Sequence, residues 1–199
     1  MMSNRLMAID LSTTATGFAL FDLDSRQLID FGAIKPDKKG MSKLNYPKKQ
    51  LYIMRNLAEK LVWLIKAKGP RIILIEEVNR HKSRTSGKTL DGMHYILLQY
   101  LPDEFLTLVR YRDSDGPTGW RTKLNLRLSE NDKKANAEHK KLNKKLKPKD
   151  QLVIINKKHL AARYVNAALG TKFDVDADPY TNDVVDAIGL GLAELLTLK

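Results

Sequence analysis

The sequence predicts one α/β domain on a five-stranded mixed sheet, a three-stranded antiparallel meander plus two parallel strands, flanked by helices. Three observations predict it. Short apolar segments separated by turn residues fill the first 34 residues, a long amphipathic segment follows, and the apolar run RIILIEE comes directly after it. A helix leading into a short, uninterrupted apolar strand is typical of a parallel crossover. The 199 residues, 43% of them hydrophobic, suit a single domain over 1–199.

The meander comes first. Residues 6–11 and 16–22 are apolar enough to be strands, and the polar connection Ser12-Thr13-Thr14-Ala15 near Gly17 joins them. Residues 27–34 alternate between apolar and polar side chains, which favours a third strand. Pro36 and Gly40 then mark a loop.

Two helices and two further strands complete the predicted sheet. Apolar residues recur at helical spacing from Tyr46 to Lys68, and Gly69-Pro70 ends that pattern. The run from Arg71 to Glu77 is continuous enough for a strand buried on both faces. We expect a second helix over 89–101 and the last strand over 105–111, followed by a loop at 113–119.

The second half of the chain carries a Lys-rich insertion at about 117–149. Within it, residues 129–149 have few large apolar groups, so they form either a solvated helix or a mobile segment. Residues 151–169 and 179–198 are predicted to close the chain as two helices, the last strongly apolar.

Composition limits the classes of partner and site. The net charge of +12 and the pI near 9.7 favour a polyanionic partner such as nucleic acid. Residues 117–172 hold 15 basic and 4 acidic side chains, so most of this excess lies in one segment. The chain has no cysteine, which excludes disulfides and zinc–thiolate sites and favours magnesium or manganese on oxygen ligands. No apolar run is long enough for a membrane span, and we expect a soluble, cytoplasmic protein without membrane contact.

Acidic residues end two of the predicted strands. Asp10 ends the first strand, at the carboxyl edge where ligand sites of open α/β sheets lie. Glu76 or Glu77 ends the parallel strand that follows the first helix. Because side chains alternate along a strand, only one of these two can join Asp10 around a cation. The alternative is that these acids cap turns or are solvated.

Asp183 and Asp186 are three residues apart in the last predicted helix, so they share one helix face. With Thr181 or Asn182 as N-cap, both lie where the positive helix end favours ionised carboxylates. Acids are common in first helical turns for the same reason, so this pair alone is a weak signal. Four carboxylates in one chain with a basic segment indicate a metal-dependent nuclease.

The chain resembles the RuvC family of Holliday-junction resolvases, which have a ribonuclease H-like fold. The segments that carry the resemblance are AIDLSTTATGFALFD at 8–22, ILIEEV at 73–78 and NDVVDAIGLGLA at 182–193. The family's Asp, Glu and D-x-x-D-A positions fall on Asp10, Glu76, Asp183 and Asp186, and they select Glu76 over its neighbour. GWRTKLN at 119–125 and the length resemble phage and other viral members more than bacterial ones, and we expect the chain to be most like those of lactococcal phages.

The resemblance implies a homodimeric endonuclease that nicks four-way, and also three-way, DNA branches and leaves 5′-phosphates. Its four carboxylates would be both catalytic residues and ligands of two magnesium ions, with manganese as a substitute. The helix at 89–101 is our candidate dimer interface, and the host cytoplasm would be the location of a phage-encoded protein. Two positions depart from bacterial members: Ser12 replaces a glycine, and Asn79 replaces the aromatic wedge, which favours broader branched-DNA activity.

Candidate DNA contacts come from four segments. Cations that follow Glu76 should rim the site, and a tryptophan with two cations offers a stacking ring. Four lysines over 140–145 would form one stripe if that segment is helical, and the resemblance implies that Lys157 and Lys158 begin a helix that holds phosphate. Any one lysine is also explained as a solvated surface charge. The candidates are Arg80, Lys82, Arg84, Lys88, Trp120, Arg121, Lys123, Lys140, Lys141, Lys144, Lys145, Lys157 and Lys158.

Two other functions compete with a nuclease. Actin-like ATPases and sugar kinases open with a similar strand and turn, but they need two such domains and an adenosine motif. A non-catalytic branched-DNA-binding protein would explain the basic segment. It would not explain four carboxylates, since clustered charges without metal are costly.

Overall fold

The computed structural model describes residues 3–39, 41–77, 84–178 and 180–198. Its centre is one five-stranded sheet in the order β3-β2-β1-β4-β5. The strands are β1 (Ser3–Asp10), β2 (Thr16–Asp22), β3 (Leu28–Ile34), β4 (Pro70–Glu76) and β5 (Val109–Arg112). The first three pair antiparallel, and β4 pairs parallel with both β1 and β5. The predicted five-stranded mixed sheet is therefore confirmed.

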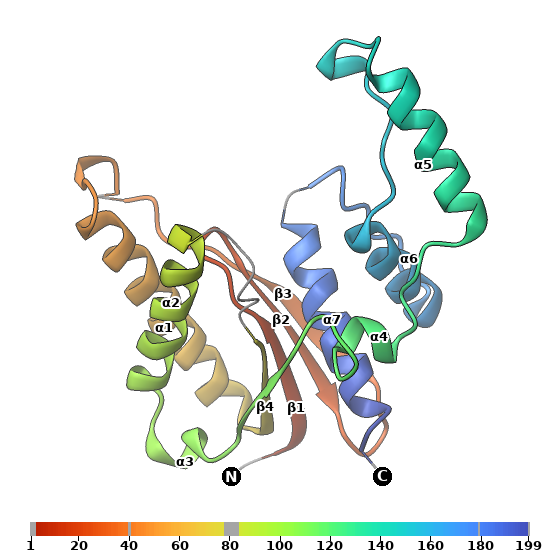
Figure 1. Ribbon diagram of the computed structural model, residues 1–199. Helices are drawn as coiled ribbons and strands as arrows, with labels where there is room; N and C mark the ends of the chain where they lie inside the picture. The colour runs from red at the N-terminus through yellow and green to blue at the C-terminus, as the bar shows by residue number, and fades with distance from the viewer. Residues whose placement is uncertain (1–2, 40, 78–83, 179, 199) are drawn as a thin grey trace.

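One face of the sheet is covered by α1 (Lys48–Lys68) and α2 (Arg84–Tyr100) (Figure 1). Helix α1 buries one apolar stripe against this face and ends at Gly69, whose left-handed φ of 54° suits a glycine C-cap. Successive side chains of β1 and β4 point alternately to this face and to the opposite one, and both sets are buried, as is typical of parallel strands at the centre of a sheet. The core of this layer includes Met7, Ile9, Leu57, Leu61, Ile65, Ile73, Ile75, Met93 and Leu97.

The other face is covered by α7 (Thr181–Leu195), with α4 (Trp120–Lys123) and α6 (Lys157–Leu169) beside it. Helix α7 is buried on nearly all sides, which agrees with its strongly apolar sequence. Two glycines let large rings approach it. A Cβ at Gly189 would lie 2.6 Å from the Trp120 ring, and one at Gly191 would lie 2.2 Å from Phe21. The remaining short helices are α3 (Asp103–Leu106) and the 3₁₀ turns at Met41–Lys43 and Pro148–Asp150.

Helix α5 (Glu130–Asn143) stands away from the sheet and extends beyond α6 in Figure 1. It settles the open alternative for 129–149 in favour of a solvated helix over most of that segment. Ser129 begins it with a capping box, in which the serine hydroxyl accepts from the Asp132 amide at 3.1 Å. We call α5 and the following residues up to 156 the basic arm.

Several element boundaries differ from the prediction. The helix predicted over 151–169 begins only at Lys157, because residues 151–156 run extended beside α5. The strand predicted over 105–111 is shorter, since α3 takes its first residues. Helix α4 lies in a segment for which no helix was predicted. No helix among the described residues is long and apolar enough to cross a membrane.

Candidate active site

Asp10 and Glu76 end the two neighbouring parallel strands β1 and β4. Ile9 pairs with Ile75 in this register, so the two acids occupy adjacent positions. The residues two and four places before each acid all lie in the core beneath α7: Leu6, Ala8, Ile72 and Leu74. Both acids therefore point to the α7 face. Glu77, one residue later, is exposed and outside the acidic group, so the structure agrees with Glu76 as the sequence choice.

Asp183 and Asp186 come to this face on α7. Gly17 pairs with Asp10 across the β1–β2 ladder, and a Cβ on it would lie 2.0 Å from the Asp183 carbonyl oxygen. Glycine at position 17 thus lets the first turn of α7 contact the sheet beside Asp10. The expected cap is wrong, since the N-cap residue is Tyr180 and its side chain accepts no capping hydrogen bond.

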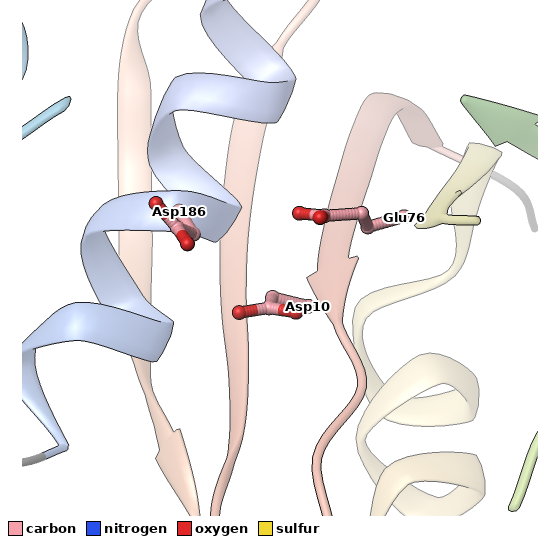
Figure 2. Close-up of side chains that lie close together, drawn as sticks. All are labelled: Asp10, Glu76 and Asp186. Carbon is pink, nitrogen blue, oxygen red and sulfur yellow. The ribbon is translucent and has the colours of Figure 1, made fainter. Parts of the chain in front are cut away.

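Three of the four predicted carboxylates converge. Asp10, Glu76 and Asp186 each place one oxygen within 4.8 Å of the others, and Figure 2 shows them pointing into one space from two strands and a helix. Asp186 is only 5% exposed. Asp183 is half-buried and lies outside this group, although its charge contributes to the electrostatics of Asp10.

Burial and mutual repulsion favour the protonated forms of these acids. The pKa of Asp10 is raised well above its usual value by burial and by the charges of Glu76, Asp186 and Asp183. Burial also raises the pKa of Asp186 to about 6, with Arg121 opposing the rise and Glu76 adding to it. A nearby cation would offset this repulsion and stabilise the ionised carboxylates.

Arg121 supplies one cation from α4. Its Nη2 donates to Asp186 Oδ2 at 2.7 Å, and its Nη1 lies 3.7 Å from Glu76 Oε1. Burial acts to lower the pKa of Arg121, but Asp186 and Glu76 outweigh it and raise that pKa. The guanidinium also lies over the Trp120 ring, 4.4 Å from its centroid.

Trp120 is fully buried, so the expected exposed stacking ring for DNA is wrong for this structure. The ring packs against α7 at Gly189, and its indole Nε1 donates to Glu76 Oε2 at 3.2 Å. Trp120 and Arg121 are therefore neighbours of the carboxylates rather than surface contacts. The sequence signal for this packing is the pair of glycines in GLGLA of α7, because a glycine inside a helix often allows a close packing contact.

The donor set fits a divalent cation of the magnesium class. All three converging groups are carboxylates, the ligands that hard cations prefer. In addition, Asp186 Oδ1 is buried and accepts no hydrogen bond. A buried anionic oxygen without a donor is costly, and a metal ion would satisfy it.

The remaining predicted DNA contacts are spread over several elements. Arg80 and Lys82 lie outside the described residues, as does the side chain of Arg84. Lys88 is exposed on α2, and Lys123 is half-buried on α4. Lys140, Lys141, Lys144 and Lys145 are exposed, but α5 ends at Asn143, so only the first two lie within the helix. Lys157 and Lys158 are exposed at the start of α6, where Lys157 pairs with Asp115 at 2.8 Å.

Similarity to solved structures shows the fold. The RuvC of Thermus thermophilus in complex with a Holliday junction substrate is 13% identical, with a TM-score of 0.58 over 95% of this chain and 91% of that chain. Another structure of the same RuvC is 12% identical, with a TM-score of 0.56 over 95% of this chain and 92% of that chain. A fowlpox virus resolvase in complex with Holliday junction DNA is 13% identical, with a TM-score of 0.50 over 98% of this chain and 99% of that chain.

The predicted ribonuclease H-like fold is confirmed by these likenesses. A scan against protein-family models and a search of curated proteins find no match. The resemblance to lactococcal-phage members stays a prediction.

Proposed function

We propose that this chain is a divalent-metal-dependent endodeoxyribonuclease that nicks Holliday junctions and other branched DNA. The observation that carries the proposal is the convergence of Asp10, Glu76 and Asp186 within 4.8 Å, where Asp186 Oδ1 has no hydrogen-bond donor. The fold it shares with two junction-bound resolvases supports branched DNA as the substrate. The excess of basic residues over 117–172 supports a polyanion as well.

The chain's own residues would divide the work as follows. Asp10, Glu76 and Asp186 would hold two magnesium ions together with Asp183 on the same face of α7, and manganese would substitute. Bound there, the ions would polarise the scissile phosphate and activate water, leaving a 5′-phosphate. Trp120 would hold the Glu76 carboxylate in place through its indole N–H.

Two opposed strands must be nicked to resolve a junction, so we propose a homodimer. The outer side of α2 remains our candidate interface, since Tyr95 there is 73% exposed and Tyr100 is 38% exposed. Sedimentation of the free protein measures its oligomeric state. A purely monomeric protein would contradict the homodimer, because one monomer nicks only one of the two strands.

The test of function uses labelled four-way junctions, forks and linear duplex, each with and without magnesium. We expect nicks in the two branched substrates only when magnesium is present. A DNA ligase should reseal them, because it requires a 5′-phosphate beside a 3′-hydroxyl. A shifted junction without nicks would indicate the non-catalytic binder, and ATP turnover would indicate the kinase class.

Asp10→Asn should keep junction binding and lose cleavage by about three orders of magnitude, because one ligand charge of the cluster disappears. Nicking rates and gel shifts measure the two properties separately. Glu59→Gln is the matched control, since it removes one carboxylate charge from an exposed position on α1. Near-wild-type nicking by Asp10→Asn contradicts the assignment of this site.

A further inference from the structure

The guanidinium of Arg121 occupies the space that the site carboxylates face. It contacts Asp186 at 2.7 Å and Glu76 at 3.7 Å. Among the ion pairs of the described residues, Arg121 is the only cation that contacts a member of the acidic group. Because a divalent ion binds ligand carboxylates directly through their oxygens, this contact and a metal ion compete for the same carboxylates, Asp186 and Glu76.

A second buried carboxylate on α7 shows what a purely structural pair looks like here. Glu194 is 3% exposed, and its Oε2 accepts from Arg112 at 2.5 Å while Arg110 lies 3.9 Å from Oε1. Two arginines thus serve one carboxylate. Near the start of α7, by contrast, Arg121 alone serves two carboxylates, Asp186 and Glu76.

The pairing of Arg121 is also incomplete. It engages Asp186 through Oδ2 alone, and the buried Oδ1 of that carboxylate accepts no hydrogen bond. Arg121 therefore reduces the repulsion among the acids without satisfying them. Such a contact is suited to replacement by an ion that engages more oxygens.

We propose that Arg121 is an exchangeable counter-ion of the acidic site. It holds Asp186 and Glu76 together while no divalent cation is bound, and it leaves them when one binds. This inference rests on the proposed function. The affinity for metal is then set by a competition, and the released guanidinium, anchored beside the site on α4, becomes available to a DNA phosphate.

Trp120 provides a direct reporter of this exchange. Its indole donates to Glu76, and its ring lies beneath the Arg121 guanidinium at 4.4 Å. The only other tryptophan, Trp63, is 71% exposed on α1. In a Trp63→Phe background, fluorescence comes from Trp120 alone and reports whether the guanidinium leaves the ring.

The experiment titrates magnesium into the full chain without DNA, followed by calorimetry and by Trp120 fluorescence. Magnesium should change the Trp120 signal along the calorimetric binding curve. Arg121→Gln should bind magnesium about tenfold more tightly, because no cation must be displaced, and should lose most of the fluorescence change. Arg112→Gln, which removes a half-buried arginine from the Glu194 pair, should leave magnesium affinity unchanged.

Unchanged or weaker magnesium affinity in Arg121→Gln overturns the proposal, as does tight binding to the parent with no change in Trp120 fluorescence. Should Arg121→Gln fail to fold, Arg121→Lys gives the same test. Its single ammonium cannot bridge both carboxylates as the fork does, so tighter binding than the parent is expected and equal binding contradicts the idea. Magnesium-dependent nicking by the parent decides the proposed function separately, whichever way the Arg121 variants behave.

Discussion

Single residues decide how close the sheet and α7 come to each other. Gly17 is the clearest case, because any side chain there would collide with the Asp183 carbonyl and push away the helix that carries Asp186. The acidic site thus depends on a residue that takes no part in its chemistry. Sequence patterns do not reveal this role, since a glycine in a strand indicates a close approach without naming the partner.

His94 on α2 makes stability depend on pH. Its ring is buried against Tyr111, with the centroids 5.5 Å apart. Burial lowers the pKa of His94 from 6.5 to about 4, with Asp91 opposing the shift. Between these two values the unfolded chain binds a proton that the folded chain does not, so falling pH removes stability, up to about 3 kcal/mol.

We expect His94→Gln to remove this loss. Urea unfolding at about pH 7 and about pH 4.5 gives the free energy of unfolding for both proteins. The raised pKa values of Asp10 and Asp186 act in the opposite direction, since protonating those acids relieves the folded state. The difference in unfolding free energy between parent and variant isolates the contribution of His94. If this difference is the same at both pH values, the pKa of His94 is not lowered in the folded protein.

At the scale of elements, the basic arm is held by polar side chains. Asn136 donates to the Ile155 carbonyl at 2.7 Å and accepts from its amide at 2.8 Å. Asn143 does the same with Leu152 at 2.9 and 2.7 Å, and His139 Nδ1 lies 2.7 Å from the Val153 carbonyl oxygen. These three residues share one face of α5. Their contacts with the backbone of 152–155 form a ladder, in which the helix side chains replace the hydrogen bonds of a neighbouring strand.

Asn136→Ala should therefore loosen the arm and leave the sheet intact. The change removes two hydrogen bonds and leaves the Ile155 amide and carbonyl unpaired, a local cost of about 2 kcal/mol. Hydrogen exchange should become faster in α5 and 152–155 but not in β1 or β4. The control is Asn131→Ala, at an exposed position of the same helix, and equal effects of both changes would refute the ladder as the support.

The same ladder explains why α6 begins at Lys157 and not at Gln151, as apolar spacing predicts. The β-branched run Val153-Ile154-Ile155 favours an extended chain, and α5 supplies its hydrogen-bond partners, so the helix starts later than apolar spacing suggests. Helix α4 was not predictable for a different reason. Four residues show no periodicity, and tertiary contacts of Trp120 hold them in place.

At the scale of the whole molecule, the sheet and the acid positions were predictable and the immediate surroundings of the acids were not. Asp10 follows from its place at the end of a buried strand, which is a local pattern. Alternation leaves either Glu76 or Glu77 beside it, and the family resemblance selects Glu76. Arg121 reaches them across 45 residues of chain from Glu76, so its place depends on how α4 packs on α7. From the sequence alone, Arg121 is one more cation of a basic segment, and only the packing of α4 on α7 places it beside the acids.

The basic arm places four lysines far from the acidic site, and this arrangement leads to a last prediction. Lys140, Lys141, Lys144 and Lys145 are exposed at the end of the basic arm, which extends away from the sheet in Figure 1. If they contact phosphates, changing all four to Gln should weaken junction binding and make the slope of log K against log salt shallower by about 3 to 4. Calcium in place of magnesium keeps the junction uncut during the measurement.

The matched control changes four exposed lysines to Gln, three between β3 and α1 and one at the first residue of α1: Lys38, Lys39, Lys43 and Lys48. It lowers the net charge equally, so any effect of overall charge on binding is the same in both variants. Only a larger loss of slope in the arm variant identifies the arm as a DNA-binding surface. Equal slopes would mean that the arm attracts DNA through total charge and makes no phosphate contacts of its own.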